Sequence, residues 1–264
     1  MTTKRILCAV ALMMVLCTAK AQRLVLFKNY GKNWATTAVS NKNKPNGYIY
    51  RLRQEKQCDD LPPVAETKEL ELFIAERIDV GWLGLFRTPM GSGDYDFVVV
   101  IYNQQKQPLN VVNLCDVAMN RYCEVQDVRW DAATRHLLFN MACPSYASEI
   151  GGKGSKLYCY DVDKEQVVWQ TDYLVSNDIF ILDENFVYCS YGFTSEKKFL
   201  YMLDKQTGKV YSKLPLVYKA RYLELQENGG RKRLYVVDYN MNLIVFSVVG
   251  KPALKASVAT LAEA

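Results

Sequence analysis

Short apolar runs separated by polar turns dominate this 264-residue chain. One run recurs as Leu-Tyr-x-x-Asp, and a polar turn and a second apolar run follow each copy. The runs are rich in Val, Ile, Leu, Tyr and Phe and are bounded by Asn, Asp, Gly, Lys and Pro, as β-strands are. No stretch has the long 3.6-residue spacing of an amphipathic helix. The pattern predicts an all-β chain, with copies of the run at Leu157–Asp161, Leu200–Asp204 and Leu234–Asp238.

The spacing of the repeat predicts units of four strands. In each unit a first short strand precedes a second apolar strand, such as Phe186–Tyr191, and the Leu-Tyr strand and an outer strand follow. A weaker copy of the run lies at Val99–Asn103. The turn Asp204–Lys209 carries a glycine near its end, where a positive φ is often needed. Repeated units of four short strands are typical of the blades of a β-propeller.

The phrase Leu-Tyr-x-x-Asp, then a turn, Gly-Lys-Val and an aromatic residue, resembles the blade repeat of quinoprotein-like (PQQ-like) and WD40-like propellers. The match is best over Leu200–Leu214 and extends over roughly Glu76–Val249. The resemblance implies a structural role, backbone hydrogen bonding in a turn, for Asp161, Asp204 and Asp238. Quinone-dependent dehydrogenases also use a larger propeller and a pair of adjacent cysteines, which this chain lacks. The resemblance therefore implies the fold and no cofactor.

We expect a single β-propeller domain of about five blades over residues 22–264. Residues 76–250 contain the four clearer blades, and residues 251–264 form a tail. Residues 22–75 would supply a further first blade, from the strand-like runs Trp34–Ser40 and Tyr48–Arg53.

The first 21 residues have the pattern of an export signal. Lys4 and Arg5 precede the apolar run Ile6–Thr18, and small residues at Ala19 and Ala21 suit a cleavage site. The apolar run is shorter than the ~20 residues that cross a bilayer. We therefore expect cleavage and a periplasmic or secreted protein without membrane insertion.

The charge balance gives no electrostatic reason to expect nucleic acid as a partner. Of the 33 lysines and arginines, three lie in the signal segment, which leaves 30 basic residues against 28 acidic ones. Nucleic-acid binding normally requires a pronounced basic patch.

Six cysteines remain after the signal segment, and six cysteines allow 15 pairings. Cys115 and Cys123 are the best candidates for a disulfide, because the short segment between them can close as a loop. Cys159 and Cys189 lie in apolar strands, where cysteine is usually a small buried hydrophobe. The absence of C-x-x-C spacing and the single histidine, His136, argue against a zinc site. We expect His136 to be a turn or surface residue instead of a general base.

A second repeat places an aspartate at the start of three units, at Asp79, Asp127 and Asp178. The first strand of a propeller blade lines the central channel, so these carboxylates are candidates for a ring at the channel mouth. Such a ring would hold a cation, or supply the paired carboxylates of a glycosidase. The alternative is that each aspartate accepts hydrogen bonds from local backbone donors. The fourth unit breaks the pattern, with Tyr222 at the equivalent position and Glu224 displaced.

These patterns favour an exported propeller that acts as a binding or scaffold module for a protein or glycan, with no catalytic residue assigned. The alternative is a carbohydrate-active hydrolase that uses the three aspartates. A third hypothesis is a partial propeller completed by a partner or by a second copy.

Overall fold

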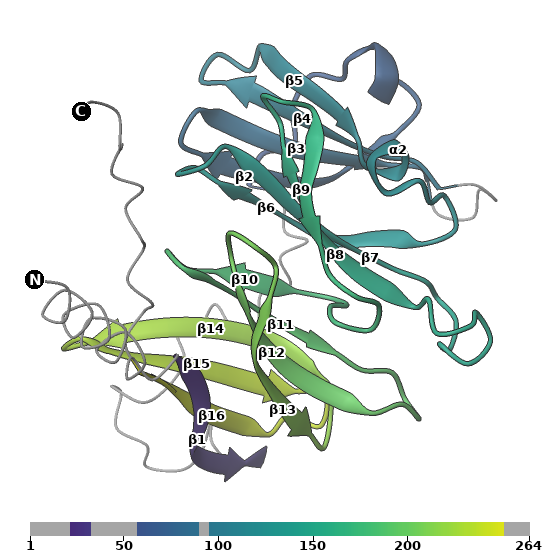
Figure 1. The fold of residues 1–264 in the computed structure, drawn as a ribbon. Helices are drawn as coiled ribbons and strands as arrows, with labels where there is room; N and C mark the ends of the chain where they lie inside the picture. Colours follow the sequence, from purple (N-terminus) through teal and green to yellow (C-terminus); the bar gives the residue numbers. More distant parts are fainter. Residues whose placement is uncertain (1–21, 33–56, 90–94, 251–264) are drawn as a thin grey trace, which may run out of the picture.

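The computed structural model describes residues 22–32, 57–89 and 95–250. Within them, four antiparallel sheets of four strands each follow one another along the chain, as the blades of a β-propeller do (Figure 1). The all-β propeller fold predicted from the repeat is confirmed. The signal segment, the tail and the strand-like runs at residues 34–40 and 48–53 lie outside the described residues.

Each of the first three sheets is built from four consecutive strands. The first sheet contains β2 (Glu71–Ile78), β3 (Gly81–Arg87), β4 (Phe97–Asn103) and β5 (Pro108–Asn113). The second contains β6 (Glu124–Asp131), β7 (His136–Ala142), β8 (Ser155–Asp161) and β9 (Gln166–Gln170). The third contains β10 (Phe180–Leu182), β11 (Phe186–Tyr191), β12 (Lys198–Asp204) and β13 (Val210–Leu216). A short helix, α2 (Leu114–Ala118), connects the first two sheets, and a 3₁₀ turn, η4 (Ala65–Thr67), precedes β2.

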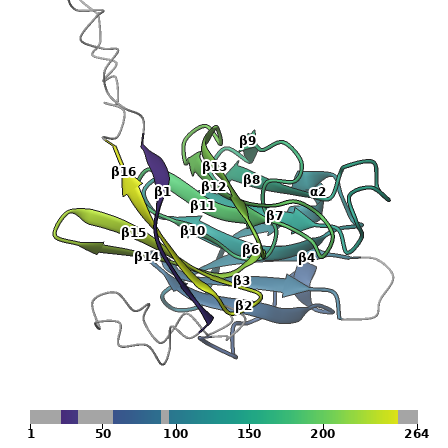
Figure 2. The ribbon, with the colours of Figure 1, turned by 90° about the horizontal axis from the view of Figure 1, so that it is seen from below.

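The fourth sheet joins the two ends of the described chain. It contains β14 (Ala220–Asn228), β15 (Arg231–Asp238), β16 (Leu243–Val249) and, as its outer strand, β1 (Arg23–Gly31). β1 and β16 run side by side and antiparallel (Figure 2). Part of the segment expected to form a separate first blade therefore completes the fourth sheet instead. The other described part of that segment leads into β2.

The N-terminal strand also changes where the sequence repeat falls. The Leu-Tyr run is the third strand of the second and third sheets, β8 and β12, and its weaker copy is β4. In the fourth sheet the same run is β15, the second strand. Because β1 supplies the outer strand of that sheet, the expected order of strands is shifted by one there.

Apolar side chains fill the spaces between neighbouring sheets. Val99 and Ile101 of β4 share one buried cluster with Leu137 and Phe139 of β7. Similar clusters join the second sheet to the third and the third to the fourth. Burying each such side chain contributes about 1.5–3 kcal/mol, so these layers fix the order of the sheets. The first strands, β2, β6, β10 and β14, face the middle of the molecule (Figure 1).

The first sheet has a different neighbour on its other face. Side chains alternate along a strand, so Val98, Val100 and Tyr102 of β4 point away from the second sheet. They pack against Leu61 and neighbouring residues that precede β2. The Tyr102 hydroxyl donates a hydrogen bond to the Pro62 carbonyl over 2.7 Å. This segment covers the face of the first sheet, and the described residues form an open row of sheets and not a closed ring.

The three repeat aspartates have the structural role that the resemblance implies. Each ends a strand, and one carboxylate oxygen accepts two backbone N–H groups of the following turn. Gly208, in the turn after Asp204, has the expected positive φ of 69°. The three aspartates that accept these turn hydrogen bonds are Asp161, Asp204 and Asp238.

Asp161 should stabilise the protein in a pH-dependent way. Hydrogen bonds from the Lys164 side chain and then from its backbone lower the pKa of Asp161 from 3.8 to about 2. A depressed carboxyl pKa contributes stability that is complete above the ordinary value and is lost as the pH falls through the folded value. We expect the stability difference between wild type and Asp161→Asn to narrow between pH 4 and pH 2, in the window set by these two pKa values. Urea unfolding at each pH measures this difference.

An NMR titration of the Asp161 carboxyl, in wild type and in Lys164→Met, checks the cause assigned to the lowered pKa. Lys164→Met removes the main cause of the shift, so the pKa of Asp161 should rise toward its ordinary value. An unchanged pKa in this variant would contradict the assignment.

Candidate functional site

Asp79 lies in a hairpin turn and not at the start of a first strand. β2 precedes it, and Ile78 pairs with Gly81, which leaves Asp79 and Val80 as the two-residue turn between β2 and β3. The Asp79 carboxylate accepts a hydrogen bond from the Trp130 indole nitrogen over 2.6 Å. Asp79 thus connects the first sheet to the end of β6. Its position is not equivalent to those of the other two aspartates.

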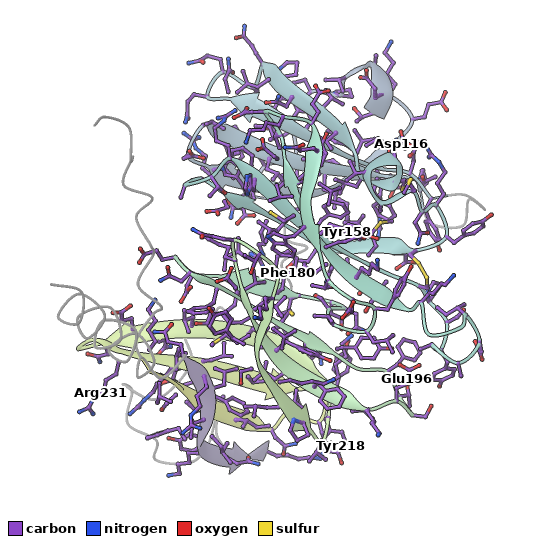
Figure 3. The ribbon with its side chains drawn as sticks, viewed as in Figure 1. Asp116, Tyr158, Phe180, Glu196, Tyr218 and Arg231 are labelled. Atoms are coloured by element: carbon purple, nitrogen blue, oxygen red, sulfur yellow. A yellow bond between two sulfur atoms is a disulfide. The ribbon has the colours of Figure 1, made fainter. Side chains whose placement is uncertain are left out.

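Asp127 is a buried residue of β6, with 1% of its surface exposed. Its carboxylate accepts hydrogen bonds from the backbone nitrogens of Val128, at 3.0 Å, and Phe180, at 3.1 Å. The Arg129 guanidinium lies 3.1 Å from the same carboxylate. Asp127 therefore satisfies backbone donors, one of them on the third sheet. Figure 3 shows Phe180 between the second and third sheets.

Asp178 lies just before β10 and connects three sheets. Its backbone nitrogen donates to Gln126 of the second sheet, and its carbonyl accepts a hydrogen bond from Asn140. Its carboxylate lies 2.5 Å from the Lys219 ammonium and accepts a hydrogen bond of 2.8 Å from the Tyr239 hydroxyl. Burial lowers the pKa of Lys219, and burial together with Asp178 raises the pKa of Tyr239.

The structure therefore places Asp127 and Asp178 at one interface between sheets and Asp79 elsewhere. Each of the three carboxylates already has partners that hold neighbouring sheets together. Among the described residues, no three His, Cys, Asp or Glu side chains gather as a group that could hold a metal. Sequence reasoning missed Lys219 and Tyr239, because the pattern at those positions is that of ordinary strand ends.

The cysteines differ from the expected pairing. Cys123 is bonded to Cys143, with 4.1 Å between their Cα atoms, and Cys115 is a buried thiol. Glu124 pairs with Ala142 in the β6–β7 ladder, so Cys123 and Cys143 are the next facing positions. Cys115 lies in α2, where its side chain is buried in the apolar cluster between the first two sheets. Register between strands, and not loop length, sets the pairing.

The other two strand cysteines, Cys159 and Cys189, are buried as expected. Burial raises the pKa of each thiol to about 12, which disfavours the reactive thiolate. His136 opens β7, with its Nδ1 atom 3.5 Å from the Cys159 sulfur and its Nε2 atom 3.6 Å from an Asp161 oxygen. Because this thiol is buried and protonated, the Cys–His pair does not resemble an activated nucleophile.

A groove of about 410 Å³ lies between the first and second sheets. One wall is β5, from Leu109 to Asn113, and α2 contributes Asp116 and Val117. The opposite wall comes from β8 and the turn that follows it, with Tyr160, Val162 and Glu165. Figure 3 shows Asp116 on α2, at the outer side of the molecule.

The groove combines exposed apolar surface with negative charge. Leu109 is 50% exposed and Val111 is 41% exposed. Asp116 and Glu165 are the charged residues of the lining, which has no lysine or arginine. Polar groups make up most of the exposed lining, and the two exposed apolar side chains lie among them.

No helix in the described residues is long and apolar enough to span a membrane.

No family model matches this chain, and no curated protein matches it. Among solved structures, Saccharomyces cerevisiae Sqt1 is 12% identical, with 69% of this chain and 47% of Sqt1 covered, and a TM-score of 0.47. The β-propeller domain of the Trilobed protease from Pyrococcus furiosus is 11% identical, with 64% and 49% covered and a TM-score of 0.41. TolB from Acinetobacter baumannii is 13% identical, with 64% and 41% covered and a TM-score of 0.33. The chain spans about half the length of these structures, and its own four antiparallel sheets make it a β-propeller protein.

Proposed function

We propose that this protein is an exported β-propeller that binds a protein partner in the groove between its first and second sheets. The groove itself is the observation that carries the proposal, because it gathers exposed apolar side chains, two acids and other polar groups in one hollow. Export is proposed from the signal pattern of residues 1–21.

The hydrolase hypothesis has less support than the binding hypothesis. A glycosidase needs two carboxyl groups that face one open pocket about 5–10 Å apart. Asp127 is buried and bound to Arg129, Asp178 is bound to Lys219 and Tyr239, and Asp79 bonds to Trp130. None of the three carboxylates lines the groove. We therefore assign the three aspartates a role in holding neighbouring sheets together.

Peptide selection tests the proposed function. The purified protein is used to select displayed random peptides of about twelve residues, a length that exceeds one strand. We expect enriched peptides whose affinity falls at least about tenfold, or ~1.4 kcal/mol, in Leu109→Arg, which puts a large cation into the groove.

Val217→Arg is the matched control, because Val217 is 78% exposed and lies outside the groove. Its affinity for the selected peptides should equal that of wild type. A selection that enriches no peptide, while a glycan array gives strong binding, would show that the partner is a carbohydrate and would overturn the proposal.

A further inference from the structure

The edge of β5, and not one of its faces, forms a wall of the groove. Five consecutive residues, Leu109 to Asn113, line it. Successive side chains of a strand point to opposite faces of the sheet. Side chains from both faces of the strand can border the same hollow only if the hollow lies beside the edge of the strand. The groove therefore runs along the backbone of β5.

This edge has no strand partner among the described residues. β5 is the last strand of its sheet and pairs only with β4. In an edge strand, alternate residues direct their N–H and C=O groups away from the sheet. Such a row of backbone groups is a template on which a further strand can pair.

The outer strands of the next two sheets are covered differently. The Trp169 ring of β9 lies against Gly208 in the third sheet, and its indole nitrogen donates to the Lys205 carbonyl over 3.0 Å. β13 of the third sheet contacts β1 of the fourth. β9 and β13 also end their sheets, and β5 differs in that its edge borders the groove.

The charge of the groove indicates the kind of segment that would fit. Glu165 is exposed in the turn after β8 and forms no ion pair with a described residue. Asp116 pairs with Arg121, but 65% of its side chain is exposed. Two acids without a basic residue in the lining favour a cationic side chain on the ligand.

We infer that the groove binds an extended segment of another protein, which pairs with β5 as an added strand and presents a lysine or arginine to Glu165 and Asp116. This inference rests on the proposed binding function and adds to it the conformation and the charge of the ligand. Backbone pairing supplies affinity in this mode, and the side-chain contacts supply specificity.

Backbone methylation of the selected peptides tests the strand addition. Methylating an amide nitrogen removes one donor and leaves the side chains in place. We expect methylation at alternate residues to weaken binding by at least about tenfold in one register and to have little effect in the other, because only every second residue faces β5. Amide hydrogen exchange of residues 109–113 should slow when the peptide is bound. Equal effects in both registers, or unchanged exchange in β5, would overturn the inference.

A charge swap tests whether the ligand presents a basic side chain to Glu165. Peptides with lysine or arginine should bind Glu165→Lys about tenfold more weakly than wild type, and replacing that basic residue by glutamate should restore binding to the variant. Glu184→Lys is the matched control, because Glu184 is exposed in the β10–β11 turn and outside the groove. It should leave affinity unchanged. Selected peptides without a basic residue, or equal loss in both variants, would contradict the assigned charge.

The outcomes separate this inference from the proposed function. If the selected peptides bind wild type and fail to bind Leu109→Arg, but backbone methylation does not weaken their binding, the proposed function stands and the strand addition is overturned. Failure to select any peptide would overturn both. A protein that sediments as a dimer, and becomes monomeric in Val111→Pro, would show that a second copy occupies the edge and would also overturn the inference.

Discussion

Replacing Gly81 by alanine is expected to destabilise the protein by at least about 3 kcal/mol, because the first sheet has no room for a side chain there. Gly81 has a φ of 152°, a conformation that residues with a Cβ atom rarely adopt. An added Cβ would lie 2.3 Å from the Asn103 carbonyl carbon and from the Tyr102 carbonyl oxygen, which are backbone atoms of β4. Relief would require β3 and β4 to separate. Urea unfolding of Gly81→Ala measures the loss.

Gly229→Ala separates backbone strain from this steric conflict. Gly229 has a φ of 59°, and no atom lies within 4 Å of its added Cβ. We expect Gly229→Ala to cost only about 1 kcal/mol, the typical cost of the left-handed conformation. Similar losses in the two variants would contradict the close approach of β3 and β4 at Gly81.

The sequence predicts most of the strands because their signal is local. The Leu-Tyr runs are nearly all apolar and end at an aspartate that nucleates a turn, so β8, β12 and β15 were recognisable from short windows. The sequence does not predict β2, because Glu71, Glu76 and Arg77 interrupt its apolar residues and its burial is mixed. Without β2, the pattern places Asp79 at the start of a first strand, whereas it lies in the turn between β2 and β3.

The position of β1 was not predictable from local patterns. Arg23 pairs with Val249, at the other end of the described chain. Pairing at such a separation depends on the whole fold, because sheet order is fixed by packing between sheets. The same reason explains the shift of the repeat in the fourth sheet.

The candidate groove was beyond sequence reasoning for a related reason. Its residues come from β5, α2 and the turn after β8, and only the packing of the first sheet on the second brings them together. The exposed Leu109 and Val111 were a weak signal, because isolated exposed apolar residues are common on protein surfaces. The Cys123–Cys143 bond likewise follows from the register of β6 and β7, which the sequence leaves open.

A buried ion pair connects the second and third sheets, and the second large loss of stability is expected when one of its members is removed. The Lys205 ammonium lies 3.0 Å from the Asp131 carboxylate, and 9% of each side chain is exposed. Asp131 also accepts a hydrogen bond from the Thr134 hydroxyl over 2.8 Å. Removing one member of such a pair leaves the other charge buried without its partner.

Lys205→Met is therefore expected to destabilise the protein by about 3 kcal/mol, since Met keeps the length of the side chain and removes the charge. Adding Asp131→Asn should recover part of this loss, because the amide removes the uncompensated charge and still accepts the Thr134 hydrogen bond. Lys106→Met is the matched control: its partner Asp60 has a side chain that is 77% exposed, so this change should cost far less than Lys205→Met. Urea unfolding of wild type, the three single variants and the double variant measures both the losses and the coupling. If Lys205→Met cost no more than Lys106→Met, or if the double variant were as unstable as the sum of its single changes, the pair would not hold the second and third sheets together.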